Sequence, residues 1–510
     1  MPVSVLSLTI LVVAFSLFQS VRAQNLAAEA PEPTLIRVGF PNDQEGEYPL
    51  TLGSVGDMDG DGVADLVVGF RGAGYPMLAL IEGRNGRTIR TAPWPVEGDS
   101  VTASEVMAVE GIADVDGDGV PDLAVGAWSR HYGRVDGARV YVVSGRTGAL
   151  LRRLTAPQPA AYDYFGSALA LLDDITGDGV QEVGIGSMNG GAGGRAYVYD
   201  GRTWEVVYTW DAPATVPGPG LGGRFGEAVS AIGDVDADGV GDVGVGASYD
   251  RDGRGTVSVY SGKTGGLIYR VESPAADQWG GFGQEVSGVG DLDGDGVPDF
   301  AVGAPYFGDR DTGRAYIFSG RSGAPVLTIP PPGYRQNGWF GMGVVPVSPL
   351  VGDGGPALLI SAPGGEGLWY VVDAKTGEVL VRQGSPTRWH GGQFGSSVSA
   401  EGWIAVLALD PPVLYLYKYG DDPQAPFRLD AIYPNPTLGA VTVRASLPQD
   451  GPYQLAVIDM LGRPVYRARG VGVAGTNELS LSLDGLPPAV YVVVVEVGET
   501  RIVEKVAVIR

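Results

Sequence analysis

The chain has 510 residues, a formal net charge of −24 and no cysteine. The negative charge argues against nucleic-acid binding, because little in the chain would neutralise phosphates, and the lack of cysteine excludes disulfides and thiol chemistry. With 82 Gly, 37 Pro and only 18% charged residues, the composition favours a turn-rich, all-β protein of two or three domains.

The N-terminus contains an apolar run that ends in Val21-Arg22-Ala23, a small-x-small pattern before Gln24. The run has the length of a signal peptide and is short for a membrane-spanning helix. We therefore expect a signal peptide over residues 1–23 and a linker over 24–34. The mature protein would be soluble and exported, with no transmembrane segment. A membrane anchor is the alternative.

A motif of alternating aspartates, such as GDLDGDGVPDFAVGA (290–304), recurs five times at a near-constant period. Its first aspartates are Asp57, Asp114, Asp174, Asp234 and Asp291, which gives gaps of 57, 60, 60 and 57 residues. Strand-like runs and a Gly-rich hairpin follow each motif. Two further units, starting at Phe340 and Phe394, keep this frame without the aspartates. Seven units of about four strands predict a seven-bladed β-propeller, whose ring residues 34–40 could close by pairing with the last unit.

Three units carry a Phe-Gly pair nine residues before the first aspartate: Phe165-Gly166, Phe225-Gly226 and Phe282-Gly283. Together with the aspartate loops and Gly303-Ala304-Pro305, these pairs resemble the FG-GAP repeat, the blade unit of the integrin alpha-chain propeller. The resemblance covers residues 35–427 and is strongest in units three to five. It implies that the aspartate loops join the first two strands of each blade and have a structural role, on the face away from the main ligand contacts.

The aspartate loops have the donor pattern of a metal site. Side-chain oxygens fall at positions 1, 3, 5 and 9, position 6 is glycine, and position 7 can offer a carbonyl. This set suits Ca²⁺ better than Mg²⁺, which demands stricter geometry. An EF-hand is excluded, because position 12 of the fifth loop is Val302 and the flanking residues read as strands. A set of acidic turns that bind nothing is the alternative.

We therefore expect up to five Ca²⁺ ions. The third loop should bind most weakly, because neutral Thr176 occupies position 3. The candidate ligands are Asp57, Asp59, Asp61, Val63, Asp65, Asp114, Asp116, Asp118, Val120, Asp122, Asp174, Thr176, Asp178, Val180, Glu182, Asp234, Asp236, Asp238, Val240, Asp242, Asp291, Asp293, Asp295, Val297 and Asp299.

Aromatic residues gather in the loops expected on the opposite face of the ring, where side chains presented on loops suit protein or glycan recognition. The alternative is that these rings pack between blades. The candidates are Trp128, Tyr132, Tyr249, Trp279, Tyr306, Trp339 and Trp389.

Catalysis has little support in the sequence. The chain has only two histidines, His131 and His390, and lacks a Gly-x-Ser-x-Gly elbow or a zinc-binding histidine cluster. We expect a secreted or cell-surface propeller that acts in adhesion or in binding an extracellular protein or glycan. An extracellular enzyme acting on polysaccharide is the second hypothesis, and a purely structural surface scaffold is the third.

Residues 428–510 form a separate segment of short strand-like runs divided by Gly, Pro and Asp turns, which predicts a small immunoglobulin-like β-sandwich. Four features stand out: Tyr433-Pro434-Asn435-Pro436, Asp459-Met460-Leu461-Gly462-Arg463, the run 486–491 (LPPAVY) and Lys505-Val506 near the end. They closely resemble the C-terminal sorting domain of type IX secretion cargo. The resemblance implies a bacterial protein that engages the secretion machinery and reaches the cell surface or the medium. An ordinary immunoglobulin-like binding module is the alternative.

Overall fold

The computed structural model divides the chain into two compact units, Met1–Tyr419 and Gly420–Arg510. It describes residues 34–508 apart from 40–47, 72–75, 84–85, 94–104, 129–137, 161, 214–221, 276–278, 334–335, 348–355, 366, 385–393, 401–402, 410–411, 419–427, 434–439, 448–450, 459–462, 473–474, 484–485, 488 and 498–499. The expected signal peptide, nearly all of the expected linker, and the residues just before the expected boundary at 427 lie outside the described residues.

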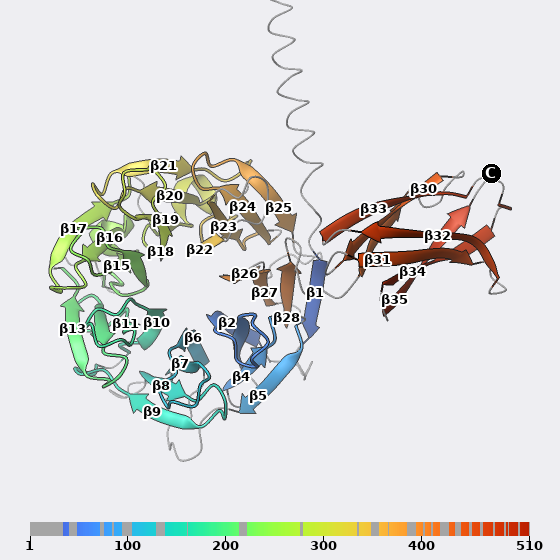
Figure 1. Cartoon of the computed structure of the whole chain (residues 1–510). Coiled ribbons are helices and arrows are strands. Elements are labelled where there is room, and N and C mark those ends of the chain that lie inside the picture. Colours follow the sequence, from blue (N-terminus) through green and yellow to red (C-terminus); the bar gives the residue numbers. More distant parts are fainter. Residues whose placement is uncertain are drawn as a thin grey trace, which may run out of the picture. The chain divides into compact units, whose positions relative to one another are not determined.

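The described residues of the first unit form seven four-stranded antiparallel sheets arranged in a ring (Figure 1), the arrangement of a β-propeller. We number the sheets one to seven along the chain. In the first six, each strand pairs with the next one in sequence. The strands of sheets one to three are β2 (Tyr48–Val55), β3 (Asp65–Arg71), β4 (Pro76–Ile81), β5 (Thr88–Pro93), β6 (Glu105–Ile112), β7 (Asp122–Trp128), β8 (Ala138–Val143), β9 (Leu150–Leu154), β10 (Phe165–Leu171), β11 (Val183–Ser187), β12 (Arg195–Tyr199) and β13 (Val206–Asp211).

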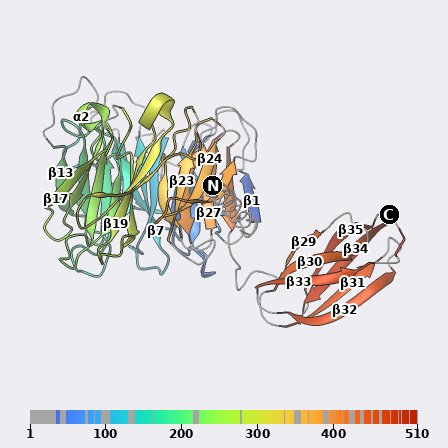
Figure 2. The ribbon, with the colours of Figure 1, turned by 90° about the horizontal axis from the view of Figure 1, so that it is seen from above.

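Sheets four to six repeat this pattern. Their strands are β14 (Val229–Gly233), β15 (Asp242–Ala247), β16 (Thr256–Tyr260), β17 (Leu267–Glu272), β18 (Glu285–Gly290), β19 (Asp299–Ala304), β20 (Arg314–Phe318), β21 (Pro325–Ile329), β22 (Val344–Val347), β23 (Ala357–Ala362), β24 (Leu368–Asp373) and β25 (Val379–Gly384). Two short helical turns, α2 (Asp250–Gly253) and η1 (Phe307–Asp311), join the second and third strands of sheets four and five. Both turns lie at the same rim of the ring (Figure 2).

The seventh sheet joins the two ends of the unit. It contains β26 (Phe394–Ala400), β27 (Trp403–Leu409), β28 (Pro412–Lys418) and, as its outermost strand, β1 (Thr34–Gly39). β1 runs antiparallel to β28 in an unbroken register from Thr34 opposite Lys418 to Gly39 opposite Val413. The expected pairing of residues 34–40 with the last unit is therefore confirmed for β1. This pairing closes the ring through backbone hydrogen bonds.

The hydrophobic core of the ring lies between successive sheets. Every residue of β15, β19 and β23 is buried, because neighbouring sheets cover both of their faces. For example, Val257 and Val259 of β16 share a cluster with Phe300 and Val302 of the next sheet. Runs of β-branched and aromatic residues suit such two-sided burial. Because the strands are buried between sheets, binding or catalytic sites are expected on the loops at the two rims of the ring.

The described residues of the second unit form two sheets with one shared core. Val443 of one sheet and Val457 and Val493 of the other all lie in this core. The first sheet contains β29 (Arg428–Tyr433), β30 (Ala440–Leu447) and β33 (Gly475–Ser482), and the second contains β31 (Gly451–Ile458), β32 (Pro464–Gly472), β34 (Ala489–Val497) and β35 (Thr500–Val508). The core residues contributed by β30, β31 and β34 are spaced two apart, as the two-residue period of a strand requires: Val441 and Val443, Leu455 and Val457, and Tyr491, Val493 and Val495.

Candidate cation loops and ligand face

All five aspartate loops join the first strand of a sheet to the second. In each loop, one oxygen from each of three carboxylates lies within 4.8 Å of the others. Such a convergence of oxygens is what a hard divalent cation needs. The groups are Asp57, Asp59 and Asp61; Asp114, Asp116 and Asp122; Asp174, Asp178 and Glu182; Asp234, Asp236 and Asp242; and Asp291, Asp293 and Asp295.

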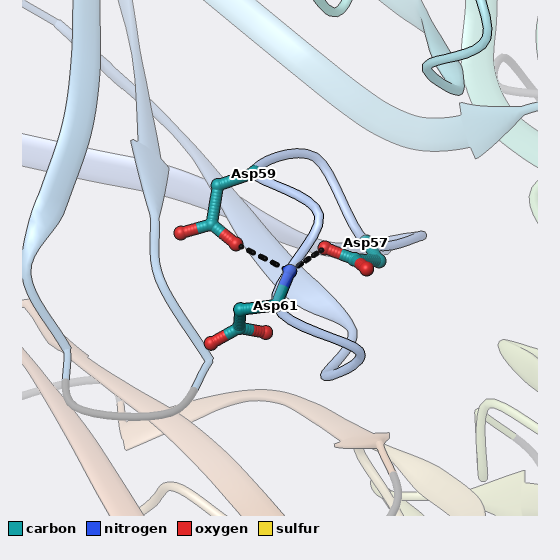
Figure 3. A group of neighbouring side chains, drawn as sticks. All are labelled: Asp57, Asp59 and Asp61. Atoms are coloured by element: carbon teal, nitrogen blue, oxygen red, sulfur yellow. Dashed lines mark hydrogen bonds between the residues drawn. The ribbon is translucent and has the colours of Figure 1, made fainter.

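The aspartate at position 1 organises each loop by accepting backbone hydrogen bonds. In loop one, Asp57 Oδ1 accepts from the N–H of Gly60 at 2.7 Å and of Asp61 at 3.0 Å, while Oδ2 accepts from Gly62 at 2.8 Å. Asp59 Oδ1 also accepts from the Asp61 N–H, at 3.1 Å. Figure 3 shows the three carboxylates turned toward one another around that N–H group. The loop backbone thus contributes directly to gathering the acids.

Positions 4 and 6 both have a left-handed backbone. In loop five these positions are Gly294 (φ 82°) and Gly296 (φ 84°). A Cβ at either residue would meet nothing within 4 Å, so the demand for glycine is conformational and not steric. Loop four instead places Ala237 at position 4 with φ 61°, which strains that loop. The glycine at position 6 was predicted from the sequence, whereas the requirement at position 4 was not.

The acid at position 9 links the loop to a second segment of its own sheet. Asp299 is fully buried; its Oδ2 accepts from the Leu292 N–H at 2.8 Å, and its Oδ1 accepts from the Gly320 N–H at 3.0 Å. Gly320 lies in the hairpin between the third and fourth strands. Asp65, Asp122 and Asp242 make the same pair of bonds. Position 9 is therefore a strut between loop and hairpin as well as a candidate ligand.

Burial raises the pKa of every position-9 acid, to about 6 for Asp65 and Asp242. In contrast, backbone N–H groups, first that of Gly119, lower the pKa of exposed Asp114 at position 1. A cation in the loop would offset the burial penalty and favour the ionised form at position 9.

Loop three differs from the others in the way its acids are used. Thr176 Oγ1 donates to Glu182 Oε1 at 2.8 Å, and the Ile175 N–H donates to Oε2 at 2.5 Å. One hydroxyl thus replaces a carboxylate and also occupies an oxygen of the position-9 acid. The geometry agrees with the expectation that this loop offers a cation the fewest charges.

The valines expected to offer carbonyl oxygens at position 7 have a clear backbone role. Val297 donates its N–H to Asp295 Oδ1 at 2.9 Å, and Val63, Val120, Val180 and Val240 make the equivalent bond. These bonds orient the position-5 carboxylates. Cation binding by the valine carbonyl oxygens stays a prediction.

Basic residues of the hairpins contact the loops, a role that was not predicted from the sequence. Arg146, Arg202 and Arg321 each form an ion pair with the position-5 aspartate of their own sheet. Lys263 instead donates to the Asp238 carbonyl at 2.8 Å. The signal was present in the repeated turns SGRTG, DGRT, SGKTG and SGRSG, which keep the period of the loops.

Three of the predicted ligand-face residues lie near one another. Tyr249 and Trp279 meet edge to face with ring centroids 5.8 Å apart, and the guanidinium of Arg224 lies 4.1 Å above the Tyr249 ring. Tyr306 packs against Gly281, two residues after Trp279: a Cβ on Gly281 would lie 2.8 Å from the Tyr306 ring. Trp279 is 59% exposed. Arg224, which directly precedes Phe225 and has a left-handed backbone (φ 55°), was not predicted from the sequence.

This cluster has a polar base. Arg224 Nη1 pairs with Glu227 at 3.0 Å, and the Ser248 hydroxyl also donates to Glu227. One face of the Trp279 indole rests against Gly253, because a Cβ there would lie 2.5 Å from the ring. More than half of the Trp279 surface is nevertheless exposed.

The other predicted ligand-face residues are more enclosed or are not described. Trp128 is half-buried, with its ring centroid 5.4 Å from that of Tyr164, and Trp339 is also half-buried. These two fit the alternative of packing within the ring. Tyr132 and Trp389 lie outside the described residues.

The ring of four-stranded sheets has the arrangement of a β-propeller, and parts of it are similar to the FG-GAP repeat. Residues 282–318 match the FG-GAP repeat, and residues 57–125 match the FG-GAP-like repeat. Residues 431–509 match the Secretion system C-terminal sorting domain. The resemblances inferred from the aspartate loops and from the C-terminal motifs are both confirmed.

Similar proteins include several integrin alpha chains. Integrin alpha-8 of Gallus gallus is 28% identical over 251 residues, which cover 46% of this chain and 22% of that protein. Integrin alpha-PS2 of Drosophila melanogaster is 33% identical over 235 residues, 42% of this chain and 16% of that protein. Integrin alpha-IIb of Homo sapiens is 33% identical over 210 residues, which cover 38% of this chain and 19% of that protein. The chain spans about a fifth of the length of these relatives.

The sorting domain implies export to the cell surface or release from the cell, with the secretion machinery as a partner. Among the residues that the structure describes, no helix has the length and apolar character needed to cross a membrane.

Proposed function

We propose that the protein is a calcium-stabilised, seven-bladed propeller that binds an extracellular protein or glycan, as an adhesion or capture protein. The observation that carries the calcium assignment is the convergence of three carboxylate oxygens within 4.8 Å in each of five loops. The donors are all oxygens, and carboxylates that can offer one or two oxygens each suit Ca²⁺ better than Mg²⁺, which demands strict octahedral geometry. Each ion would neutralise acids that otherwise repel one another, and so would stabilise its loop.

The ligand face is proposed at the rim opposite the cation loops. Successive connections of an antiparallel sheet emerge at alternate ends, so the 2→3 turns, with Tyr249, lie opposite the 1→2 loops. Trp279 lies on a 4→1 connection at the same rim. Its exposed indole face, backed by Gly253, and the neighbouring Arg224 offer an aromatic platform beside a cationic group. Such pairs are common at the centres of binding sites.

The same cluster favours binding over catalysis. Hydrolysis of a glycosidic bond commonly uses two carboxyl groups on either side of the bond. The cluster supplies Glu227, which is already paired with Arg224 and Ser248. We therefore propose a non-enzymatic role, and turnover of a polysaccharide by the purified protein would reverse this assignment.

Glycan and protein arrays probed with the mature protein, with and without calcium, test the ligand face. Trp279→Ala should abolish binding and leave the melting temperature unchanged. Leu267→Ala is the matched control, since Leu267 is 51% exposed at the start of β17, toward the other rim. Undiminished binding by Trp279→Ala would contradict the proposed site, and a lower melting temperature would show that Trp279 serves packing.

We further propose that residues 1–23 are a signal peptide and that residues 428–510 form an immunoglobulin-like sandwich read by the secretion machinery. The shared core of the two C-terminal sheets supports the sandwich. A chain lacking residues 428–510 should accumulate in the periplasm of the native bacterium. Normal export of that truncated chain would refute the sorting role.

A further inference from the structure

The hairpin between the third and fourth strands contacts the cation loop of its own sheet through one basic side chain. Arg321 Nε donates to Asp295 Oδ2 at 2.9 Å, and its Nη2 donates to the Asp295 carbonyl oxygen, also at 2.9 Å. Arg202 makes the same two contacts with Asp178, at 2.8 and 2.9 Å. In sheet two, Arg146 pairs with the Asp118 carboxylate at 3.2 Å and with its carbonyl at 2.8 Å.

Sheet four shows a variant of this contact. Lys263 Nζ reaches only the Asp238 carbonyl, at 2.8 Å, and the hydroxyl of Ser261 donates to the carboxylate at 3.3 Å. In this sheet two hairpin residues make the two contacts, to the carbonyl and to the carboxylate, that a single arginine makes in sheets two, three and five. The recurrence of the contact in four sheets makes it a feature of the repeat.

Each of these hairpins is also held from the preceding sheet. The Tyr269 hydroxyl on β17 donates to the Gly320 carbonyl of the next sheet. The equivalent donors and acceptors in the other sheets are Tyr208 to Lys263 at 3.0 Å, Trp210 to Gly265 at 2.8 Å, Arg152 to Thr203 at 3.3 Å and Arg90 to Gly145 at 3.3 Å. The fourth strand of one sheet therefore anchors the hairpin that holds the loop of the next.

We propose that the hairpin basic residues Arg146, Arg202, Lys263 and Arg321 are positioning residues that hold cation loops two to five in their binding shape before a cation arrives. The physical reason is that a position-5 carboxylate lies among other acids and is repelled by them. A guanidinium fixed to both its carboxylate and its carbonyl oxygen offsets this repulsion and fixes the backbone of the turn. The donor group on the preceding sheet fixes the hairpin that carries the basic residue.

This inference rests on the proposed function only in taking the loops to be calcium sites. The decisive test of the positioning role is made without metal. Amide hydrogen exchange of the full chain in EDTA would be followed over residues 291–297 for wild type, Arg321→Ala and Arg321→Lys. Breaking an exposed ion pair costs up to about 1 kcal/mol, so Arg321→Ala should exchange there up to about fivefold faster. Arg321→Lys should fall between, as it keeps a carbonyl contact like that of Lys263.

Two further variants sharpen the test. Arg251→Ala removes an ion pair with Glu272 at the other rim and should leave exchange of residues 291–297 unchanged. Tyr269→Phe removes only the hydroxyl that holds Gly320, and should speed exchange in both the hairpin and the loop. Faster exchange confined to the hairpin would refute the link to the preceding sheet.

Equal exchange of wild type and Arg321→Ala in EDTA would overturn the positioning role. Saturating calcium provides the separate readout of the proposed function, since it should slow exchange of the loop to the same level in both proteins. If calcium leaves wild-type exchange unchanged, the calcium role fails. The positioning role would still be judged by the metal-free comparison.

Discussion

Sheets five and six show what the aspartate loop adds to a blade. In sheet five the Gly320 N–H donates to buried Asp299, and a Cβ on Gly320 would lie 1.7 Å from the Pro298 carbonyl oxygen. At the matching place in sheet six stands Ala374, which is 2% exposed. Its N–H donates instead to the Pro356 carbonyl at 2.9 Å. The hairpin of sheet six accommodates a methyl group that sheet five excludes.

The difference teaches that the strands and the loop are stabilised by separate means. Sheet six forms without the aspartate motif, around fully buried residues such as Trp369 and Val371. In sheet five the position-9 acid draws hairpin and loop so close together that only glycine fits. The sheets themselves should therefore tolerate loss of a cation, while the rim that carries the loops should not.

Chelation is expected to have the largest effect. A site saturated at a hundredfold excess over its Kd contributes about 2.7 kcal/mol, so emptying several loops should lower the melting temperature substantially. Calorimetry in EDTA, followed by titration with calcium or magnesium, measures the loss and its metal selectivity. Hydrogen exchange should rise in loops one to five, with little change in β23 and β24. An unchanged melting curve would count against cation stabilisation.

Gly320→Ala should have the next largest effect. The added methyl group would collide with backbone, which cannot yield cheaply, so we expect a loss of about 3 kcal/mol or more in urea unfolding. The reverse change in sheet six, Ala374→Gly, should cost only about 1 kcal/mol through backbone entropy and a lost methyl contact. Equal effects of the two changes would show that the hairpins are not packed differently.

Asp299→Asn tests the strut apart from the metal when it is measured in EDTA. The amide nitrogen cannot accept a hydrogen bond, so one of the N–H groups of Leu292 and Gly320 loses its partner inside the fold. We expect a loss of about 2 kcal/mol in the free energy of unfolding. Asp293→Asn, in the exposed part of the same loop, is the control and should change stability little without metal. A loss no greater than that of the control would contradict the strut.

Glu285 gives a smaller, pH-dependent effect. Burial raises its pKa to about 8 from an ordinary value of 4.5. The folded state thus keeps a proton that the unfolded state loses between pH 4.5 and 8, and stability from this group falls over that range. Glu285→Gln should match wild type near pH 4 and exceed it above pH 8. Because the side chain keeps some solvent contact, we expect a gain of roughly 1–2 kcal/mol, less than the full pKa shift implies.

Urea unfolding of wild type and Glu285→Gln at several pH values measures this difference. Parallel stability curves from pH 4 to pH 9 would show that Glu285 is not a buried acid in the folded ring. Subtracting the two curves removes the contribution of the loop acids, which both proteins share.

Much of this organisation follows from the sequence because it is periodic. The spacing of Asp57, Asp114, Asp174, Asp234 and Asp291 predicts five loops of one kind, and the apolar strand at 34–39 predicts closure of the ring. What the sequence could not show depends on contacts between segments. The bond from Gly320 to Asp299 spans 21 residues, and the contact of Arg224 with Tyr249 is set by an unusual backbone angle. The glycine recurs in the repeated hairpin turns, but the sequence does not show which carboxylate it meets, and no repeated motif marks Arg224.

The central claim is that the repeated aspartate loops bind calcium. Native mass spectrometry of the mature full chain, after removal of metal and addition of graded calcium, counts the ions directly. The account predicts stepwise binding of up to five ions, with one fewer for Asp291→Asn combined with Asp293→Asn. The ion in loop three should bind last, because Thr176 stands in place of an acid. A chain that takes up no specific calcium ion would contradict the account.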